Sequence, residues 1–369
     1  SIAQDKDLTK RLLRAAGVPV PMGRPVKDLD DAWLAADEIG YPVAVKAAAG
    51  GGGKGFRVAL DAGALEDAFE GARREAEKFF ADTVVYLERY LPQPRHVEIQ
   101  ILADAHGNVV HLGERECSLQ RRHQKIVEET PSPFVTPAVR ANMGSVQRRH
   151  QKLVEETPSP VVSPDLRRRM GEASVTAAKA VGYRSAGTLE YLVSGDEFYF
   201  LEMNTRIQVE HTVTEMVTGI DLIREQIRIA AGEAMSVTQD QVVARGHAFE
   251  CRINAEDAAN KFLPTPGPVT AYREPNGPGV RVDSGVAAGS VIADIYDPMV
   301  AKLVVWDVDR ESARRRMLRA LREFEFAGTT TLISRATGVS GAQGDGPSGQ
   351  PALSADGRYV AFTAYAVNF

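Results

Sequence analysis

The sequence contains little cysteine and no long apolar stretch, and each absence excludes a class of protein. Only two cysteines, Cys117 and Cys251, occur in 369 residues, which excludes a disulfide framework and favours a reducing compartment such as the cytoplasm. No run of eighteen apolar residues occurs, so we expect no membrane-spanning helix and no membrane partner. Residues 1–11 are rich in charge and lack the apolar core of a signal peptide.

The chain also lacks an excess of basic residues and an initiator methionine. Its formal net charge of −5 disfavours an extended nucleic-acid-binding surface, so we expect no nucleic-acid partner. The hydrophobic fraction of 44% and the charged fraction of 25% are ordinary for a globular protein, and 369 residues suffice for two or three domains. Because the first residue is not methionine, we expect the chain to begin inside a longer protein.

Helical and strand patterns alternate irregularly along the chain. Apolar residues at helical spacing predict an amphipathic helix over residues 5–16, which Gly17 ends. Strands are predicted over residues 41–47, where a glycine loop follows, and over residues 84–90 and 96–103. Several strand pairs have hairpin spacing, so the sequence predicts an α+β fold with mixed or antiparallel sheets.

A short tandem duplication interrupts the middle of the chain. Residues 120–133 (QRRHQKIVEETPSP) recur as residues 147–160 (QRRHQKLVEETPSP). A weaker match extends the two copies to 120–144 and 147–171. Two copies are too few for a repeat architecture, so we interpret them as a local duplication.

The composition changes near the C-terminus. From about Ser334 the chain is rich in glycine, serine, alanine and proline, and residues 354–362 (SADGRYVAF) resemble one strand of a TolB-type β-propeller blade. One such strand cannot form a propeller, so we expect residues 333–369 to be an unrelated flexible tail. A propeller-type binding protein stays open as a rival that rests only on this tail.

A glycine-rich loop follows the strand that ends near Lys46. Residues 49–55 contain four consecutive glycines, and glycine lets backbone N–H groups approach phosphate oxygens without steric hindrance. The ammonium group of Lys46 is expected near the same phosphates, although no Walker-type GK[ST] sequence follows. A plain flexible loop is the alternative, but the flanking strands favour phosphate binding.

The strongest signal is a hairpin over residues 188–204, with a turn at residues 194–197. Glu202 and Asn204 are two residues apart on one strand and share a face, and Glu190 on the partner strand is expected near Glu202. Opposed carboxylates destabilise a sheet unless a cation compensates, and Mg²⁺ prefers such oxygen ligands together with nucleotide phosphates. A solvated acidic face is the alternative, but the apolar residues around Glu202 argue against simple exposure.

Three polar residues follow directly after this hairpin. If the segment is extended, Arg206, Gln208 and Glu210 point to one side. A cation, an amide and a carboxylate that converge can hold a small anion and act on it. A surface salt-bridge strip is an equal alternative for these residues alone, and the hairpin directly upstream makes the combined pattern specific.

Several segments together resemble biotin carboxylase, the ATP-grasp component of acetyl-CoA carboxylase, related acyl-CoA carboxylases and pyruvate carboxylase. They are KAAAGGGGKGFRV, LERYLPQPRHVEIQ, GERECSLQRRHQK, EMNTRIQVEHTVTEMVTGIDLIREQIRIAAGE and RGHAFECRINAEDA. The resemblance covers about residues 1–332. It implies an ATP-grasp fold with a linker helix (1–17), a lid subdomain (18–90) and a C-terminal domain (91–332) that contains the duplication.

The resemblance implies a role for each matching residue. It assigns nucleotide binding to Lys6, Lys46, Gly51, Gly52, Gly53, Glu88, Arg89, Leu91, His96, Gln120 and His123. It assigns Mg²⁺ (or Mn²⁺) binding to Glu190, Glu202 and Asn204, and the bicarbonate site to Lys125, Arg206, Gln208, Val209 and Glu210. In the family the glutamate at Glu210 is the proposed base that deprotonates bicarbonate, and the resemblance gives Arg281 the task of stabilising the enolate of biotin.

The reaction that the resemblance implies is the ATP-dependent carboxylation of biotin on a carrier protein, a first half-reaction used in fatty acid biosynthesis. ATP converts bicarbonate into carboxyphosphate, which requires a metal-neutralised γ-phosphate and a nearby base. The implied partners are a biotin carboxyl carrier protein or domain, a second copy in a homodimer, and a carboxyltransferase subunit. No Met-Lys-Met type attachment motif occurs, so we expect biotin to arrive on a partner.

The chain departs from the pattern of the family at three places. The N-terminal Rossmann-like domain of the family does not precede Lys6, and the last elements of the family are replaced by the tail. The duplication falls inside the nucleotide and bicarbonate region, so His123 and Lys125 have duplicates at His150 and Lys152. We favour the first copy in the site, because it keeps register with the strand before it.

Two rival functions stay open at this point. Another ATP-grasp ligase, such as a carbamoyl-phosphate or other carboxylate-amine ligase, shares the nucleotide site but does not need biotin. A truncated, non-catalytic ATP-binding fragment binds nucleotide without turnover.

Overall fold

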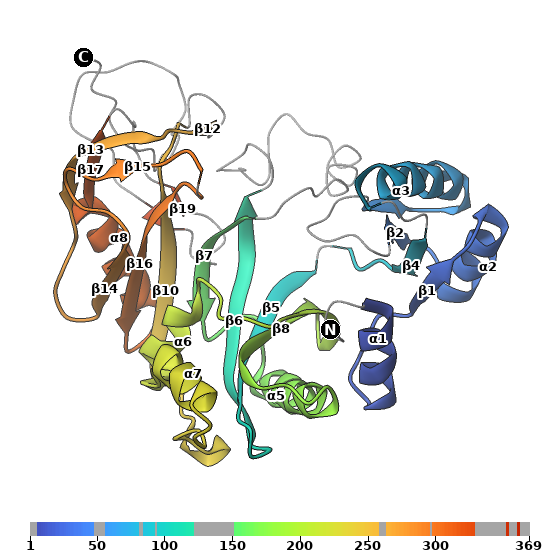
Figure 1. The fold of residues 1–369 in the computed structure, drawn as a ribbon, viewed down its shortest axis with the longest axis horizontal. Helices are drawn as coiled ribbons and strands as arrows, with labels where there is room; N and C mark the ends of the chain where they lie inside the picture. The colour runs from blue at the N-terminus through green and yellow to red at the C-terminus, as the bar shows by residue number, and fades with distance from the viewer. Residues whose placement is uncertain are drawn as a thin grey trace.

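Two antiparallel sheets of unequal size carry most of the chain in the computed structural model (Figure 1). The structure describes residues 6–47, 56–80, 84–92, 94–121, 151–257, 263–295 and 297–328, together with 352–353 and 360–361. The four-stranded sheet lies at one end of the molecule, and the eight-stranded sheet runs through its centre (Figure 1).

The four-stranded sheet has the strand order β1-β4-β2-β3, and all its pairs are antiparallel. Its strands are β1 (Gly23–Val26), β2 (Val43–Ala47), β3 (Arg57–Ala59) and β4 (Val85–Arg89). The helices that pack on it are α2 (Leu29–Ile39) and α3 (Leu65–Phe80), the latter preceded by the short η2 (Ala62–Ala64). The small side chains of Ala32, Ala35 and Ala36 let α2 approach the sheet closely, and Phe69 of α3 fills the core beside them.

The eight-stranded sheet has the strand order β14-β16-β10-β7-β6-β5-β8-β9, again with antiparallel pairs. Its strands are β14 (Val280–Ser284), β16 (Met299–Asp307), β10 (His247–Asn254), β7 (Gln151–Thr157), β6 (Val109–Arg121), β5 (Arg95–Ala103), β8 (Ser185–Ser194) and β9 (Glu197–Asn204). Antiparallel sheets with helices packed on them confirm the α+β class predicted from the sequence.

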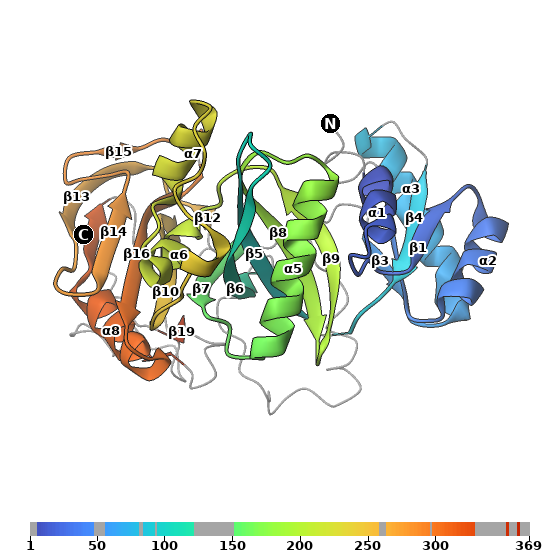
Figure 2. The same ribbon diagram turned by 90° about the horizontal axis from the view of Figure 1, so that it is seen from below.

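The two faces of the large sheet differ in chemistry. One face packs apolar side chains against α5 (Pro164–Ala180) and α8 (Arg310–Glu323). Figure 2 shows α5 running alongside β5 and β6. The other face carries α6 (His211–Thr218) and α7 (Leu222–Ala230). Side chains alternate along each strand, so every second residue faces α6 and the candidate site.

Helix α1 (Lys6–Ala15) joins the N-terminal region to the large sheet, because Leu13 and the following Val18 are buried with α5 in one core. The remaining elements are η3 (Gln239–Gln241), β11 (Glu256–Asp257), β12 (Leu263–Pro264), β13 (Gly267–Arg273), β15 (Val291–Ile292), β17 (Glu325–Gly328), β18 (Ala352–Leu353) and β19 (Val360–Ala361). No helix within the described residues is long and apolar enough to cross a membrane. The domain boundaries stay predictions, and most of the expected tail lies outside the described residues.

The second copy of the duplication supplies β7 and the start of α5. Strand β7 lies between β6 and β10, and Ser163 begins α5 by accepting a hydrogen bond from the backbone N–H of Leu166. Of the first copy, the structure describes only Gln120 and Arg121 at the end of β6. The second copy runs directly from β7 into α5, which accounts for its place in the sheet. Our preference for the first copy in the site stays a prediction, because His123, Lys125 and His150 lie outside the described residues.

Candidate functional site

The face of the large sheet below α6 is lined by charged and amide side chains. Its residues are Glu98 and Gln100 of β5, Arg115 and Cys117 of β6, Thr188 and Glu190 of β8, and Glu250 and Arg252 of β10. Most of them are buried, and electrostatic interactions are stronger in such a dry environment than in water. The strict alternation of the strands places them all on one side.

Arg115 lies at the centre of this face and is fully buried. Its Nε donates to Glu98 Oε1 at 2.5 Å. Its two terminal nitrogens donate at 2.7–3.3 Å to Gln100, Thr214, Thr188 and Gln208. Burial acts to lower the pKa of Arg115, but the charges of Glu98 and Glu210 outweigh it and the pKa is raised. The sequence analysis did not single out Arg115, although the residue lies inside the matching segment GERECSLQRRHQK.

The hairpin of β8 and β9 brings together several of the predicted residues. Glu190 Oε1 accepts hydrogen bonds from Asn204 Nδ2 at 2.7 Å and from Gln208 Nε2 at 3.0 Å. Its Oε2 lies 2.6 Å from Nε2 of His96 on β5. Glu202 is the direct cross-strand neighbour of Glu190, as the spacing predicted. The prediction that Glu202 is shielded by apolar neighbours is wrong, because the residue is exposed at this edge strand.

Glu210 stands at the N-terminus of α6 and is 2% exposed. A negative charge at this end of a helix is stabilised by the helix dipole. Nη2 of Arg252 lies 2.9 Å from Glu210 Oε2 and 2.9 Å from Glu155 Oε1 on β7. Nζ of Lys302 donates to the carbonyl oxygen of Val209 at 3.2 Å. One cation therefore bridges two buried carboxylates beside the start of the helix.

The segment between β9 and α6 is not extended, whereas the predicted convergence of Arg206, Gln208 and Glu210 assumed an extended segment. Gln208 and Glu210 are buried, whereas Arg206 is exposed and donates to the carbonyl oxygen of the neighbouring Ile207 at 3.2 Å. The chain turns at Val209 and Glu210 into α6. Strand alternation therefore does not apply to this segment, and Arg206 differs from Gln208 and Glu210 in its exposure to solvent.

Arg281 lies on β14, the strand at the other edge of the large sheet, and is about one-third exposed. Its guanidinium group pairs with Glu215 at 2.7 Å and with Asp283 at 2.8 Å. The hydrogen bonds that Arg281 donates to the carboxylate of Asp283 are the main reason that the pKa of Arg281 is raised. Arg281 also lines a cavity of about 780 Å³ between β14 and the α6–α7 region. The cation that pairs with Glu210 is Arg252. Arg252 lies in the segment RGHAFECRINAEDA, so the resemblance of that segment to the family was the sequence signal for this residue.

A second charged cluster lies where α1 meets the small sheet. Glu88 on β4 forms ion pairs with both Lys46 on β2 and Lys10 on α1. Burial raises the pKa of Glu88, but the charges of Lys46 and Lys10 outweigh it and hold the pKa at about 2. Burial is also the main reason that the pKa of Lys10 is lowered to about 8. The sequence analysis missed Lys10, whose ammonium group lies 4.8 Å from the ring centroid of Tyr86.

Other predicted nucleotide residues are only partly described. Leu91 is buried and Arg89 is exposed, close to Glu88 in the chain. The structure describes the backbone but not the side chains of Lys6 and Gln120. The predicted residues outside the described part of the chain are Gly51, Gly52, Gly53, His123 and Lys125.

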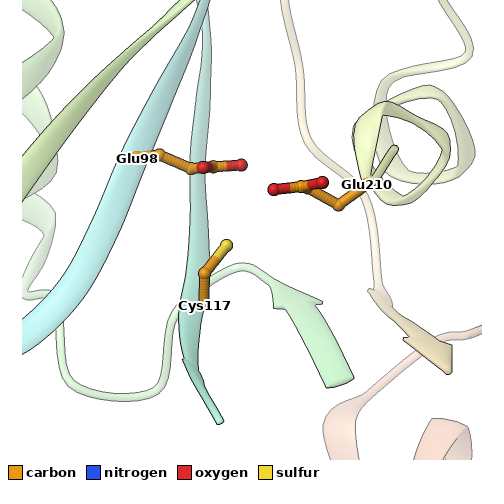
Figure 3. A group of neighbouring side chains, drawn as sticks. All are labelled: Glu98, Cys117 and Glu210. Atoms are coloured by element: carbon orange, nitrogen blue, oxygen red, sulfur yellow. The ribbon is translucent and has the colours of Figure 1, made fainter. Parts of the chain in front are cut away.

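Two groups of side chains have donor atoms suited to a cation. Figure 3 shows Glu98, Cys117 and Glu210 pointing toward one another, and their candidate ligand atoms lie within 4.8 Å of one another. Arg115 and Arg252 already pair with these two carboxylates. The set Glu190, Glu202 and Asn204 offers only oxygen ligands for a hard cation, and the exposure of Glu202 leaves the set open to a ligand. The predicted Mg²⁺ set therefore fits such an ion better than the buried trio.

Two family descriptions match this chain. "Carbamoyl-phosphate synthase L chain, ATP binding domain" matches residues 5–146 and again 142–238, and "Biotin carboxylase C-terminal domain" matches residues 250–341. The overlap of the first two matches falls between the copies of the duplication. Together with the sheets described above, the matches define an ATP-grasp fold.

Individual relatives narrow this class. The chain is 50% identical over 331 residues to a pyruvate carboxylase subunit of Methanothermobacter thermautotrophicus and 48% identical over 332 residues to "Biotin carboxylase" of Nostoc. Both alignments cover 89% of this chain, and they cover 62% and 68% of the two relatives. A biotin carboxylase from Campylobacter jejuni, solved as a complex with β-γ-ATP, is 42% identical with a TM-score of 0.76 and covers 89% of this chain and 68% of its own.

A second solved relative is the biotin carboxylase domain dimer of Hydrogenobacter thermophilus 2-oxoglutarate carboxylase, in complex with MgADP, ADP and bicarbonate. It is 42% identical with a TM-score of 0.75, and the alignment covers 89% of this chain and 67% of the relative. The chain belongs to the biotin carboxylase family, and it spans somewhat under two thirds of the length of the first of these relatives.

Proposed function

We propose that this chain carries out the ATP-dependent carboxylation of biotin, with bicarbonate as the source of the carboxyl group and carboxyphosphate as the intermediate. The observation that carries the proposal is the position of Glu210 and Arg252 on the same buried face as Glu190 and Gln208. Bicarbonate activation needs a base, a fixed cation and an oxygen-rich set close together. The solved relative with MgADP and bicarbonate supports the same ligands.

The residues around Glu210 have defined tasks in this proposal. Glu210 accepts the proton of bicarbonate while a bicarbonate oxygen attacks the γ-phosphorus of ATP and ADP leaves. The amide of Gln208 and the backbone of Val209 orient the anion, together with the exposed Arg206 and the lysine predicted at Lys125 or Lys152. The buried surroundings exclude water, which otherwise competes with bicarbonate for the phosphoryl group.

The nucleotide is bound by the small sheet and by the acidic hairpin. Lys46 reaches the phosphates together with the predicted contacts of Lys6 and the glycine loop at Gly51, Gly52 and Gly53. Glu190, Glu202 and Asn204 hold Mg²⁺, which when bound neutralises negative charge on the phosphates. The exposed carboxylate of Glu202 on the edge strand β9, directly opposite the buried Glu190, supports that assignment.

We propose Arg252 for the stabilisation of the biotin enolate, and Arg281, which the resemblance implies for this role, is the alternative. After carboxyphosphate breaks down, the ureido oxygen of biotin gains negative charge as its neighbouring nitrogen loses a proton. A fixed cation near that oxygen lowers the barrier. The guanidinium group of Arg252 lies next to Glu210, whereas that of Arg281 is held by Glu215 and Asp283.

The partners follow from the same reaction. Biotin reaches the site on a carrier protein or domain, and a carboxyltransferase uses the product. Relatives named as subunits of pyruvate carboxylase and of methylcrotonoyl-CoA carboxylase support such an assembly. The solved domain dimer supports a homodimer. The two buried free cysteines support a reducing compartment, for which we propose the cytoplasm.

Phosphate release from ATP in the presence of bicarbonate, with and without free biotin, tests the proposal. We expect turnover that depends on biotin and that falls about 10²–10⁴-fold in Glu210→Gln, because the base is removed. Glu197→Gln, at the exposed first residue of β9, is the matched control and is expected to keep full activity. Turnover without biotin dependence supports another ATP-grasp ligase, and ATP binding without turnover supports a non-catalytic nucleotide-binding protein.

A further inference from the structure

Glu250 is a buried carboxyl group that the proposed reaction does not use. The residue is fully buried in the middle of β10. Its cross-strand neighbours are Glu155 on β7 and Val304 on β16. Because Arg252 is two residues further along β10, the Glu250 and Arg252 side chains share the face that carries the candidate site.

The hydrogen bonds of Glu250 connect it to the start of α6. Its Oε2 accepts a hydrogen bond from Oγ1 of Thr212, two residues after Glu210. Its Oε1 is buried without a hydrogen-bond partner among the described residues. A buried carboxylate oxygen without a partner is costly when the group is charged. Unlike Glu98 and Glu210, Glu250 has no arginine or lysine within ion-pair distance in the described part of the chain.

The charges on this face do not balance if every carboxyl group is ionised. The buried acids are Glu98, Glu155, Glu210 and Glu250, and the cations that face them are Arg115, Arg252 and Lys302. Arg115 pairs with Glu98, and Arg252 is shared by two carboxylates. At the rim, Arg281 is already paired with Glu215 and Asp283, and His211 faces Glu215. Among the side chains that the structure describes, one acid is in excess over these three cations, and a buried excess charge is strongly unfavourable.

We propose that Glu250 is a positioning residue for Glu210: in its protonated form it balances the charge of the buried face and leaves Arg252 to pair with Glu210. This inference rests on the proposed function only where it concerns bicarbonate. The hydroxyl of Thr212 connects Glu250 to the helix start on which Glu210 lies, so the two carboxyl groups share one local structure.

The net charge of this buried face is expected to change near neutral pH. Burial is the main reason that the pKa of Glu250 is raised to about 7, and the charge of Glu210 raises it further. The charges of Lys302 and Arg252 and the hydrogen bond from Thr212 act in the opposite direction. When Glu250 loses its proton, the added negative charge competes for Arg252 and repels an anionic substrate at the neighbouring site.

The kinetic test compares the KM for bicarbonate between pH 6.5 and 8.5 in the wild type and in Glu250→Gln, which mimics the protonated carboxyl group. In the wild type we expect KM to rise about tenfold as the buried charge appears, and kcat to change much less. In E250Q we expect the rise to be absent. Glu156→Gln is the matched control, because Glu156 is a buried carboxylate on β7 that pairs with His247 and Arg310 on the opposite face. An equal rise in E250Q and the wild type overturns the proposal.

A second measurement is independent of turnover and therefore separates this inference from the proposed function. A carboxyl group with a raised pKa makes the folded state less stable as pH rises from about 4.5 to about 7. We expect this part of the pH dependence of unfolding to be absent in E250Q and retained in E156Q. If E250Q does not fold, Thr212→Val removes the hydroxyl that favours the charged form, and the midpoint is expected to move to higher pH. An unchanged pH dependence in E250Q, or an unmoved midpoint in T212V, overturns the proposal even if the enzyme turns over.

Discussion

The small sheet and the large sheet each bury a carboxyl group, and the two groups have opposite acid–base behaviour. Glu88 in the small sheet lies between two lysines, and its pKa is held at about 2. Glu250 in the large sheet has a hydroxyl as its hydrogen-bond partner, and its pKa is raised to about 7. Burial acts to raise the pKa of both carboxyl groups, because it favours the neutral form, and only at Glu88 do neighbouring charges outweigh it. The number of cations available to each carboxyl group therefore decides its charge.

This contrast corresponds to two proposed tasks. In the small sheet, a permanently charged carboxylate holds two ammonium groups in place beside the predicted phosphate site. In the large sheet, cations are scarce because Arg252 is shared by Glu155 and Glu210. A proton is then the least costly way to balance the charge.

The largest expected effect comes from removing the shared cation. Arg252→Met takes from the buried Glu155 and Glu210 the guanidinium group that they share, and we expect the free energy of unfolding to fall by about 3–5 kcal/mol. Biotin-dependent phosphate release is expected to fall about 10²–10³-fold, because the fixed charge near the reacting groups is lost. Denaturant unfolding and steady-state kinetics measure the two effects.

Arg281→Met is the matched control for this substitution. Arg281 is about one-third exposed and lies at the rim, so its ion pairs with Glu215 and Asp283 are screened by solvent. We expect a loss of at most about 1 kcal/mol in stability and less than about tenfold in activity. A variant pair with the opposite ranking would restore the enolate role to Arg281 and contradict the assignment to Arg252.

An intermediate effect is expected when the carboxylate of the small sheet is removed. Glu88→Gln leaves Lys10 and Lys46 together without the negative charge between them, and we expect a loss of about 3 kcal/mol in the free energy of unfolding. The double variant Lys10→Met, Glu88→Gln removes one of the two repelling ammonium groups. It is expected to recover part of the loss, and a double-mutant cycle measures the coupling. If the effects of the two substitutions on stability were strictly additive, the proposed interaction between Lys10 and Glu88 would be contradicted.

Glu88 and Glu250 are expected to change the free energy of unfolding with pH in opposite directions. The pKa of Glu88 is lowered in the folded state, so its contribution to stability is present above about pH 4.5 and is lost as pH falls toward 2. This contribution amounts to about 3 kcal/mol in the wild type. Unfolding measured between pH 3 and 7 is expected to show a shallower acid-side loss in E88Q than in the wild type.

The smallest effect is expected from a deletion that shortens the chain next to β7, the strand that carries Glu155. Removal of residues 121–147 joins Gln120 to Arg148 and leaves one uninterrupted QRRHQKLVEETPSP segment. The contacts described for β7 and α5 are retained, so the free energy of unfolding is expected to change by less than about 1 kcal/mol.

A matched deletion of the same length keeps the first copy instead. Removal of residues 148–174 puts Val139 at the position of Leu166 and Gln147 at that of Ser174. Leu166 and Ser174 are buried, and the Ser174 hydroxyl lies 2.8 Å from that of Tyr191. We expect this deletion to cost about 2–3 kcal/mol through a cavity and an oversized polar side chain. Equal stability of the two deletion variants would contradict the reason given for the use of the second copy.

Local patterns predicted much of the fold. Apolar spacing anticipated α1, and the hairpin spacing anticipated β8 and β9 with Glu190 opposite Glu202. These features depend on residues close together in the chain, so their geometry follows from strand alternation and helix periodicity. The exposure of Glu202 escaped prediction, because the edge position of β9 depends on which strands lie beside it.

The sequence by itself determined the family, the α+β class and the acidic hairpin, because long motifs and local periodicity carry that information. Only the tertiary structure decided that Arg252 pairs with Glu210, that Lys10 joins Lys46 at Glu88, and that the second copy forms β7. Each of these outcomes depends on segments far apart in the chain. The alternation of one strand shows which side chains share a face, whereas the order of eight strands decides which charges meet.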